Sequence, residues 1–170
     1  MIGVGASPAA ANPSTTQSVV AATSETAPVA GLNQTQMNNA KKIIDTAKSM
    51  GLGERAQIIA IATAMQESNL YNLASTKLPE SYQVPHEGEG SDHDSVGLFQ
   101  QRSSTGWGPV TELMKPEYAA HQFLQALTEV PNWQDLPVTV AAQRVQVSAY
   151  PDHYAKHEAN ATAVVRALNS

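Results

Sequence analysis

The chain of 170 residues contains no cysteine. A disulfide framework, a thiol nucleophile and a cysteine-based zinc site are therefore excluded. A domain of this length can bury a sizeable core without cross-links, so the missing cysteines do not exclude export from the cell.

Basic residues and long apolar runs are also scarce. The chain has 10 Lys and Arg against 15 Asp and Glu, a formal net charge of -5, and its nearest approach to a basic cluster is the pair Lys41-Lys42. This balance argues against non-specific nucleic-acid binding. No apolar run has the length of a membrane span. The N-terminus also lacks the basic segment and apolar core of an intact signal peptide.

Residues 1–32 differ in composition from the rest of the chain. They are rich in Ala, Ser, Thr, Pro and Val, contain a single charged residue, Glu25, and show no helical or alternating periodicity. This composition predicts a flexible tail or linker that joins a domain over 33–170 to further domains or proteins. An edge strand over 18–22 is the alternative interpretation.

Helix signals dominate residues 33–170, so we expect a mainly α domain. Apolar residues recur at helical spacing, and Asn, Gly and Pro stand where helices begin or end. The expected helices run from a cap at Asn33 or Thr35 to Met50, from Glu54 to about Asn69, after Pro109, after Pro116, from Pro137 to about Val147 with Asp135 as the cap, and after Asp152 to about Leu168. The polar segment 71–95 is long for an irregular loop, which suggests a functional role, and it has room for a small hairpin or none.

Glu67 is the strongest candidate for a catalytic residue. It closely follows a nearly continuous apolar run over 58–65. Burial and the negative end of the helix dipole would both disfavour its charged form and raise its pKa. A carboxyl group that keeps its proton near neutral pH is the general acid that cleavage of a glycosidic bond requires. A solvated glutamate at a helix end is the simpler alternative.

A second motif follows Glu67-Ser68 after about 30 positions. It reads Gly97-Leu98-Phe99-Gln100-Gln101-Arg102 and continues to Gly106-Trp107-Gly108, and Tyr150 comes later. In order and spacing, the segment 33–168 resembles the goose-type lysozyme and lytic transglycosylase superfamily. It looks closest to secreted actinobacterial lysozyme-like domains.

The resemblance implies a lysozyme-like helical domain that cleaves the bond between N-acetylmuramic acid and N-acetylglucosamine in peptidoglycan. Glu67 would be the general acid/base, Ser68 would orient the site by hydrogen bonding, and the hydroxyl of Tyr150 would approach Glu67. The residues expected to contact glycan are Ser68, Gly97, Phe99, Gln100, Gln101, Trp107 and Tyr150.

Each of these assignments has a physical basis and an alternative. Glycine lets the backbone run close to a ligand, an amide can bond sugar hydroxyls, and an exposed indole such as Trp107 can stack on a sugar face. Phe99 could instead pack in the core, and Tyr150 could pack between helices. Trp133 is expected to anchor helices. The sequence departs from the family pattern after Tyr150, where Pro151-Asp152-His153 replaces Asn-Ala-Gly.

The reaction type depends on a second carboxylate. An inverting lysozyme needs one to activate water, whereas a lytic transglycosylase needs only Glu67 and forms a 1,6-anhydro sugar. The candidates are Glu87, Glu89, Asp92 and Asp94, and we favour Asp92 and Asp94 because they lie nearest the glycine motif. The acids could equally form a solvated loop.

No metal or other cofactor is expected. The acid- and histidine-rich run 86–94 matches neither calcium-loop nor His-Glu-x-x-His spacing, and His153 and His157, four positions apart, are expected at the surface. The expected partner is the peptidoglycan glycan strand. The expected location is secreted or cell-wall-associated, or alternatively a phage virion. An inactive glycan-binding module, or a structural part of a cell-wall-crossing machine or phage particle, is the alternative function.

Overall fold

The computed structural model describes residues 25–147 and 151–170, and it is mainly helical, as the sequence predicts. The α-helices are α1 (Gln34–Ser49), α2 (Glu54–Ser68), α3 (Val110–Leu113), α4 (Pro116–Thr128), α5 (Val138–Gln146) and α6 (Glu158–Asn169). The 3-10 turns are η1 (Pro79–Gln83), η2 (Ser103–Thr105), η3 (Trp133–Asp135) and η4 (Pro151–His157).

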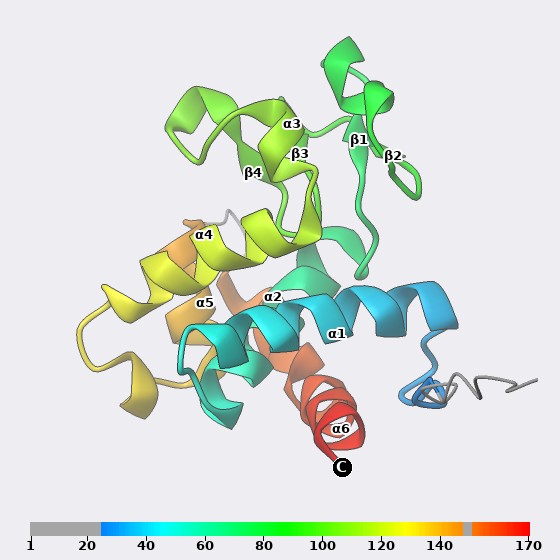
Figure 1. The fold of residues 1–170 in the computed structure, drawn as a ribbon. Coiled ribbons are helices and arrows are strands. Elements are labelled where there is room, and N and C mark those ends of the chain that lie inside the picture. Colours follow the sequence, from blue (N-terminus) through cyan, green and yellow to red (C-terminus); the bar gives the residue numbers. More distant parts are fainter. Residues whose placement is uncertain (1–24, 148–150) are drawn as a thin grey trace, which may run out of the picture.

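Short strands lie in the segment between α2 and α4. The strand β1 (Ala74–Ser75) pairs in parallel with β2 (Glu89–Gly90), with Ala74 opposite Glu89. The strand β3 (Ser95–Val96) pairs antiparallel with β4 (Gln101–Arg102), with Ser95 opposite Arg102. Figure 1 shows these strands and α3 above a layer of longer helices. We call residues 71–115 the loop lobe and the described residues on either side of it the helical body.

Local signals set the ends of the first two helices. The side chain of Asn33 accepts from the Gln36 backbone N–H, and the Gln36 side chain accepts from the Asn33 N–H, which completes a capping box. Gly51 follows the end of α1 with φ +73°, a conformation that costs glycine little. The helix α2 starts after Gly53 and ends at Asn69 in the left-handed conformation. The predictions for both helices are confirmed to within one residue.

Two later boundaries were predicted wrongly. Asp135 does not cap α5, because it lies in η3 and Pro137 is the N-cap residue of that helix. The last helix does not start directly after Asp152, because the chain first forms the 3-10 segment η4 and becomes α-helical only at Glu158. The predicted helices after Pro109 and Pro116 are confirmed as α3 and α4.

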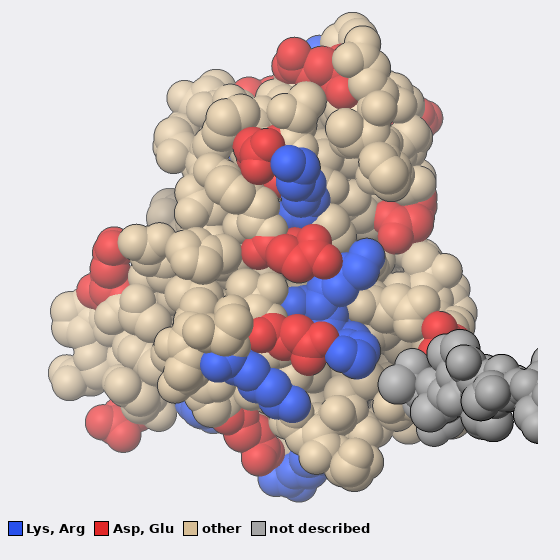
Figure 2. Space-filling view, in the orientation of Figure 1, with Lys and Arg blue, Asp and Glu red and all other residues tan. Residues whose placement is uncertain are grey.

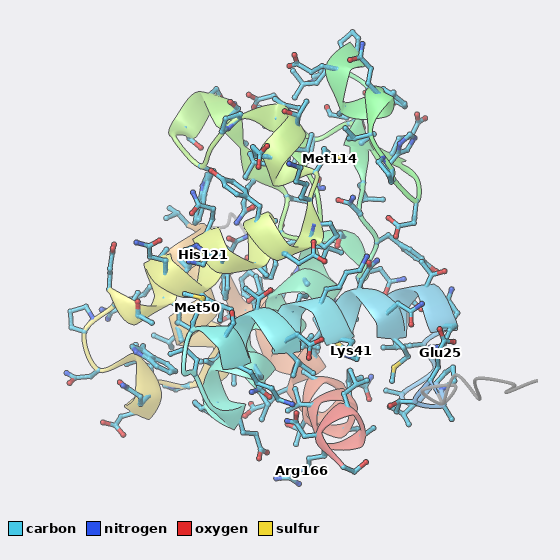
Figure 3. The ribbon with its side chains drawn as sticks, in the orientation of Figure 1. Glu25, Lys41, Met50, Met114, His121 and Arg166 are labelled. Carbon is cyan, nitrogen blue, oxygen red and sulfur yellow. The ribbon has the colours of Figure 1, made fainter. Side chains whose placement is uncertain are left out.

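The main hydrophobic core surrounds α2, which is apolar on most of its circumference. Residues from α1, α4, α5 and α6 pack against it, and Trp133 is buried among them, as expected of an anchor between helices. Val29 and Leu32 also pack on this core, so the packed chain begins before Asn33. A smaller cluster in the loop lobe includes Val96 and Met114, and Figure 3 labels Met114 beside α3.

The surface carries no patch of one charge on the face drawn in Figure 2, where acidic and basic side chains alternate over α1, α3 and α4. Ion pairs such as Lys41 with Asp45 and Lys115 with Glu112 account for part of this alternation. No helix in the described ranges is both long and apolar enough to cross a membrane.

Candidate active site

Glu67 is the second-to-last residue of α2, where the apolar helix reaches the boundary between the helical body and the loop lobe. Its carboxyl group is partly buried. The hydroxyl of Tyr154, a fully buried residue of η4, donates to Glu67 Oε1 over 2.6 Å. The body of the protein thus fixes both the carboxyl group and its hydrogen-bond donor.

The surroundings of Glu67 favour its protonated form. Burial raises the pKa of Glu67 above the ordinary value of 4.5, and the negative charge of Asp92 raises it further. Hydrogen bonds from Tyr154 and Gln146 lower the pKa, but burial is the largest effect and the net shift is upward. The upward shift expected for Glu67 is therefore confirmed, with burial as its largest cause.

Ser68 joins α2 to the glycine motif. Its side chain is buried, and Oγ lies 2.7 Å from the carbonyl oxygen of Leu98 and 3.1 Å from that of Ala64. The shorter contact crosses from the end of α2 to the loop lobe. Ser68 therefore holds the backbone of the motif beside the catalytic candidate, which is the orienting role expected of it, and its burial leaves little surface for glycan.

Gly97 has a structural requirement of its own. Its φ is +79°, and a Cβ at this position would lie 2.6 Å from the carbonyl oxygen of Leu113. No side chain fits there unless the backbone moves. Glycine is thus needed at position 97 because the backbone passes close to the end of α3. Contact of Gly97 with a sugar stays a prediction.

Two residues expected to contact glycan lie inside the protein. Phe99 is fully buried and stacks on Phe123 of α4 with ring centroids 4.8 Å apart, so core packing, the alternative interpretation, describes it better than the cleft. Gln101 is 1% exposed, and its Nε2 donates to the Ala119 carbonyl oxygen over 3.1 Å. A substrate-binding role for the Gln101 side chain is therefore corrected to one of joining β4 to α4.

Gln100 and Trp107 remain at least partly accessible. Gln100 has φ +51°, and its Nε2 donates to the Gly97 carbonyl oxygen over 2.9 Å, which closes the motif into a tight turn. Trp107 packs partly against both hydrophobic clusters, and its carbonyl oxygen accepts from Gln122 Nε2 over 2.8 Å. Both side chains keep exposed surface for the ligand contacts that the sequence predicts.

Two residues that hydrogen-bond Glu67 were not predicted as site residues from the sequence. Tyr154 provides the hydroxyl contact that was expected of Tyr150, which lies outside the described residues. Gln146, the last residue of α5, donates through Nε2 to the Phe99 carbonyl oxygen over 2.7 Å and also hydrogen-bonds Glu67. Tyr154 stands only four positions after Tyr150, so a search for other tyrosines near Tyr150 could have found it, whereas no local signal marked Gln146.

The two favoured loop acids have different surroundings. The Asp94 side chain is 22% exposed, pairs with the Arg102 guanidinium and accepts a hydrogen bond from Ser104, and these bonds lower its pKa to about 2. The Asp92 side chain is 80% exposed and pairs only with His93 among the described residues, 2.7 Å away. Of the two, Asp92 is the acid whose charge acts on Glu67.

The other loop acids serve local structure. Glu87 accepts from the Asn72 backbone N–H and from Asn39 Nδ2, and Glu89 accepts from the hydroxyl of Tyr82. Within residues 25–147 and 151–170, no three His, Asp or Glu side chains gather as metal ligands would. His157 is half-buried and bonds Gln66, and burial lowers its pKa, so it is not the freely exposed residue expected.

No protein-family model matches this sequence, and none of the curated proteins compared with it matches. The candidate site therefore stands on the residues themselves: an acid with a raised pKa, a tyrosine donor, and a glycine motif tied to the acid through Ser68.

Proposed function

We propose that this protein is a peptidoglycan muramidase with a lysozyme-like fold. It cleaves the bond between N-acetylmuramic acid and N-acetylglucosamine in glycan strands, in a secreted, cell-wall-associated or virion-borne setting. Glu67 acts as the general acid/base.

One observation carries this proposal: the carboxyl group of Glu67 is partly buried, has a raised pKa and is held by the Tyr154 hydroxyl. A general acid must be protonated before the reaction and must sit in a fixed position near the bond it cleaves. Burial raises the pKa and so favours the protonated form, and the bonds from Tyr154 and Gln146 orient the carboxyl group.

Lytic transglycosylation is the reaction that this set of residues favours. The Glu67 carboxyl group protonates the glycosidic oxygen as the bond from that oxygen to the muramic C1 breaks. The resulting carboxylate then accepts the proton of the muramic C6 hydroxyl as that oxygen bonds to C1, which gives a 1,6-anhydro sugar and returns Glu67 to its acid form. Asp94 is a poor base for water because its pKa is about 2 and Arg102 already pairs with it.

Hydrolysis with Asp92 as the base is the second candidate. Asp92 is the loop acid whose negative charge reaches Glu67, and its carboxylate is open to solvent. An inverting hydrolase places water between two such carboxyl groups on opposite faces of the sugar. In that case Asp92→Asn would stop turnover, whereas transglycosylation would continue in this variant.

The test is release of soluble muropeptides from purified cell walls by wild type and by Glu67→Gln. Glu129→Gln, an exposed glutamate at the end of α4, is the matched control. We expect Glu67→Gln to lose at least about a hundredfold in rate, the usual contribution of general acid–base catalysis, and Glu129→Gln to match wild type. Unchanged release by Glu67→Gln would reject the proposal, and a wild type that binds walls without turnover would favour the inactive-module alternative.

Product mass spectrometry separates the two reactions in the same experiment. Anhydro-muropeptides indicate transglycosylation, and reducing-end products indicate hydrolysis. The Asp92→Asn variant provides an independent check, because only the hydrolytic reaction depends on that carboxylate.

A further inference from the structure

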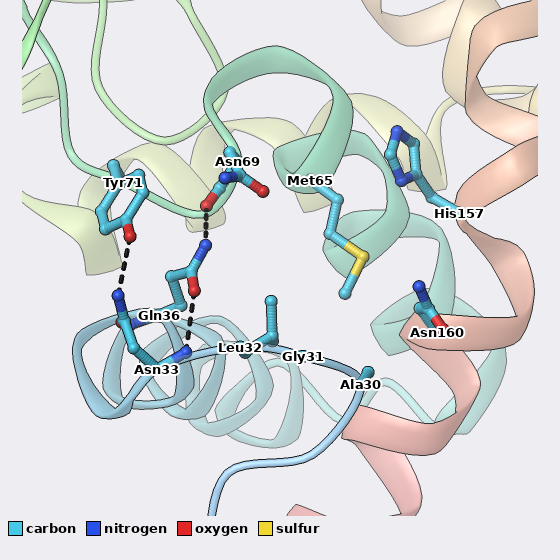
Figure 4. A pocket seen from close by; sticks show the side chains of 10 residues that line it. All are labelled: Ala30, Gly31, Leu32, Asn33, Gln36, Met65, Asn69, Tyr71, His157 and Asn160. Atoms are coloured by element: carbon cyan, nitrogen blue, oxygen red, sulfur yellow. Dashed lines mark hydrogen bonds between the residues drawn. The ribbon is translucent and has the colours of Figure 1, made fainter.

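A pocket of about 440 Å³ opens beside α2, on the side of that helix that packs against α1 and α6. Figure 4 shows that it lies where the segment before α1, the first turn of α1, the end of α2 and the start of α6 meet. Its lining residues are Ala30, Gly31, Leu32, Asn33, Gln36, Met65, Asn69, Tyr71, His157 and Asn160.

The pocket is connected to the candidate active site by two neighbouring bonds. The turn η4 bonds successive residues of α2: the Tyr154 hydroxyl donates to Glu67 Oε1 over 2.6 Å, and His157 Nε2 lies 2.9 Å from Gln66 Oε1. His157 also lines the pocket. A ligand in the pocket would therefore contact His157. The bond from His157 to Gln66 is next to the bond from Tyr154 that holds the Glu67 carboxyl group.

The lining is polar and uncharged. It includes no Lys, Arg, Asp or Glu, and its polar groups are amides, a phenol and an imidazole. The side chains of Leu32 and Met65 add an apolar surface, and Figure 4 shows Met65 between the wall with Asn33 and the wall with Asn160. A charged ligand would lose hydration here without gaining an opposite charge, whereas a ligand with polar edges and an apolar face matches both parts of the lining.

Two amides in the lining are available to a ligand. The polar groups of Asn33 and Gln36 are used within the capping box and in bonds to the Tyr71 hydroxyl and the Asn69 carbonyl oxygen. Asn69 and Asn160 are exposed, and no other described residue hydrogen-bonds their side-chain amides. Each amide offers a donor and an acceptor side by side, as recognition of a hydroxyl or acetamido group requires.

We propose that this pocket binds one uncharged N-acetylhexosamine residue of a glycan strand, away from the bond that is cleaved. A pyranose ring has an apolar face for Leu32 and Met65 and polar edges for Asn69 and Asn160. N-acetylglucosamine fits better than N-acetylmuramic acid, whose lactyl group adds a carboxylate or a peptide and meets no cation in the pocket. The identity of the sugar rests on the proposed function, whereas the existence of the site rests on the pocket.

The experiment is an NMR titration of isotope-labelled Glu67→Gln protein with the uncharged β-1,4-linked tetramer of N-acetylglucosamine. We expect saturable shifts of the backbone amides of Gly31 and Asn160, which line the pocket from outside α2. The double variant Asn69→Gly, Asn160→Ala, made in the same Glu67→Gln background, removes both free amides. Glycine keeps the left-handed conformation of Asn69 (φ +53°), and alanine suits the helical position 160. Loss of two hydrogen bonds should weaken binding about tenfold or more.

Asn132→Gly in the Glu67→Gln background is the matched control, because Asn132 is another exposed asparagine in the left-handed conformation (φ +56°), at the start of η3. It should bind like the Glu67→Gln protein. Shifts confined to residues around position 67, or unchanged affinity in the double variant, would overturn the pocket proposal. Binding does not require turnover, so a pocket that binds the tetramer in a protein without muramidase activity would contradict only the proposed function.

Discussion

Glu67 in the helical body and Asp94 in the loop lobe are carboxyl groups whose pKa values move in opposite directions. Burial against an apolar helix raises the pKa of Glu67, and hydrogen bonds from Ser104 and Arg102 lower that of Asp94 to about 2. The difference follows from how each region is built. The body removes water from a carboxyl group, whereas the lobe surrounds one with donors. Only the first arrangement shifts a carboxyl group toward its protonated form.

The same contrast holds for what stabilises the two regions. The body is held by apolar packing around α2, and the lobe has only a small apolar cluster and relies on buried polar side chains. Asn72, for example, is 3% exposed, and its Nδ2 donates to the carbonyl oxygens of Pro85 and Met114. The lobe therefore depends on particular backbone geometries that apolar packing alone would not impose.

The largest effect should come from Gly97→Ala, which tests this dependence. The new Cβ would lie 2.6 Å from the Leu113 carbonyl oxygen in a backbone with φ +79°, so we expect a loss of about 2–4 kcal/mol in the free energy of unfolding, measured in urea. The control is Gly106→Ala, where φ is +90° but no atom lies within 4 Å of the new Cβ. It should cost only about 1 kcal/mol, the conformational strain alone. Equal losses would show that contact with α3 does not matter.

A smaller effect is expected from Tyr154→Phe, which removes one of the bonds that oppose the rise in the Glu67 pKa. Without this donor, the pKa of Glu67 should rise further, and the alkaline limb of the pH–activity profile should move to higher pH. Loss of one hydrogen bond that orients the carboxyl group should reduce muropeptide release about tenfold. A reduced rate with an unmoved alkaline limb would indicate that Tyr154 only packs beside Glu67.

Much of the body follows from local sequence signals, whereas the contacts around Glu67 do not. Asn33, Gly51 and Pro116 mark helix ends by their own backbone and capping preferences, so their helices could be placed from the sequence. The partner of Glu67 depends instead on how η4 is wound between α5 and α6. An α-helix was expected where the chain forms a 3-10 segment, and this segment brings Tyr154 to the carboxyl group.

Burial in the loop lobe was equally hard to predict. Phe99 and Gln101 belong to the motif that was expected to contact glycan, yet both face α4, because the turn closed by Gln100 directs the chain back toward the body. Alternation along a two-residue strand is too short to show which side chains face inward. The acid itself could be predicted because its apolar run is continuous in sequence.

A modest gain in stability is expected from Glu67→Gln at neutral pH. The folded-state pKa of Glu67 is raised, so the unfolded chain releases this proton first as pH rises above about 4.5. The free energy of unfolding therefore falls with rising pH until the pH exceeds the higher pKa of the folded state. Glutamine does not titrate and can still accept from Tyr154. The melting temperature of the variant should exceed that of wild type by about 2 °C at pH 7, and the two should converge near pH 4. A melting temperature below that of wild type at pH 7 that converges with it at acid pH would mean that the fold favours the charged form.

The smallest effect is expected from Asp94→Asn. The contribution of Asp94 to stability should change with pH in the opposite direction to that of Glu67. The folded-state pKa of Asp94 is lowered to about 2 from 3.8, so its charge adds stability that is fully present above pH 3.8 and is lost as pH falls toward 2. The ion pair with Arg102 is partly exposed, and such pairs contribute under about 1 kcal/mol. Wild type should therefore exceed Asp94→Asn slightly in unfolding free energy at pH 6 and match it near pH 2. A variant that is more stable than wild type at pH 6 and matches it near pH 2 would place Asp94 with Glu67, among carboxyl groups whose pKa the fold raises, and would remove the contrast between the lobe and the body.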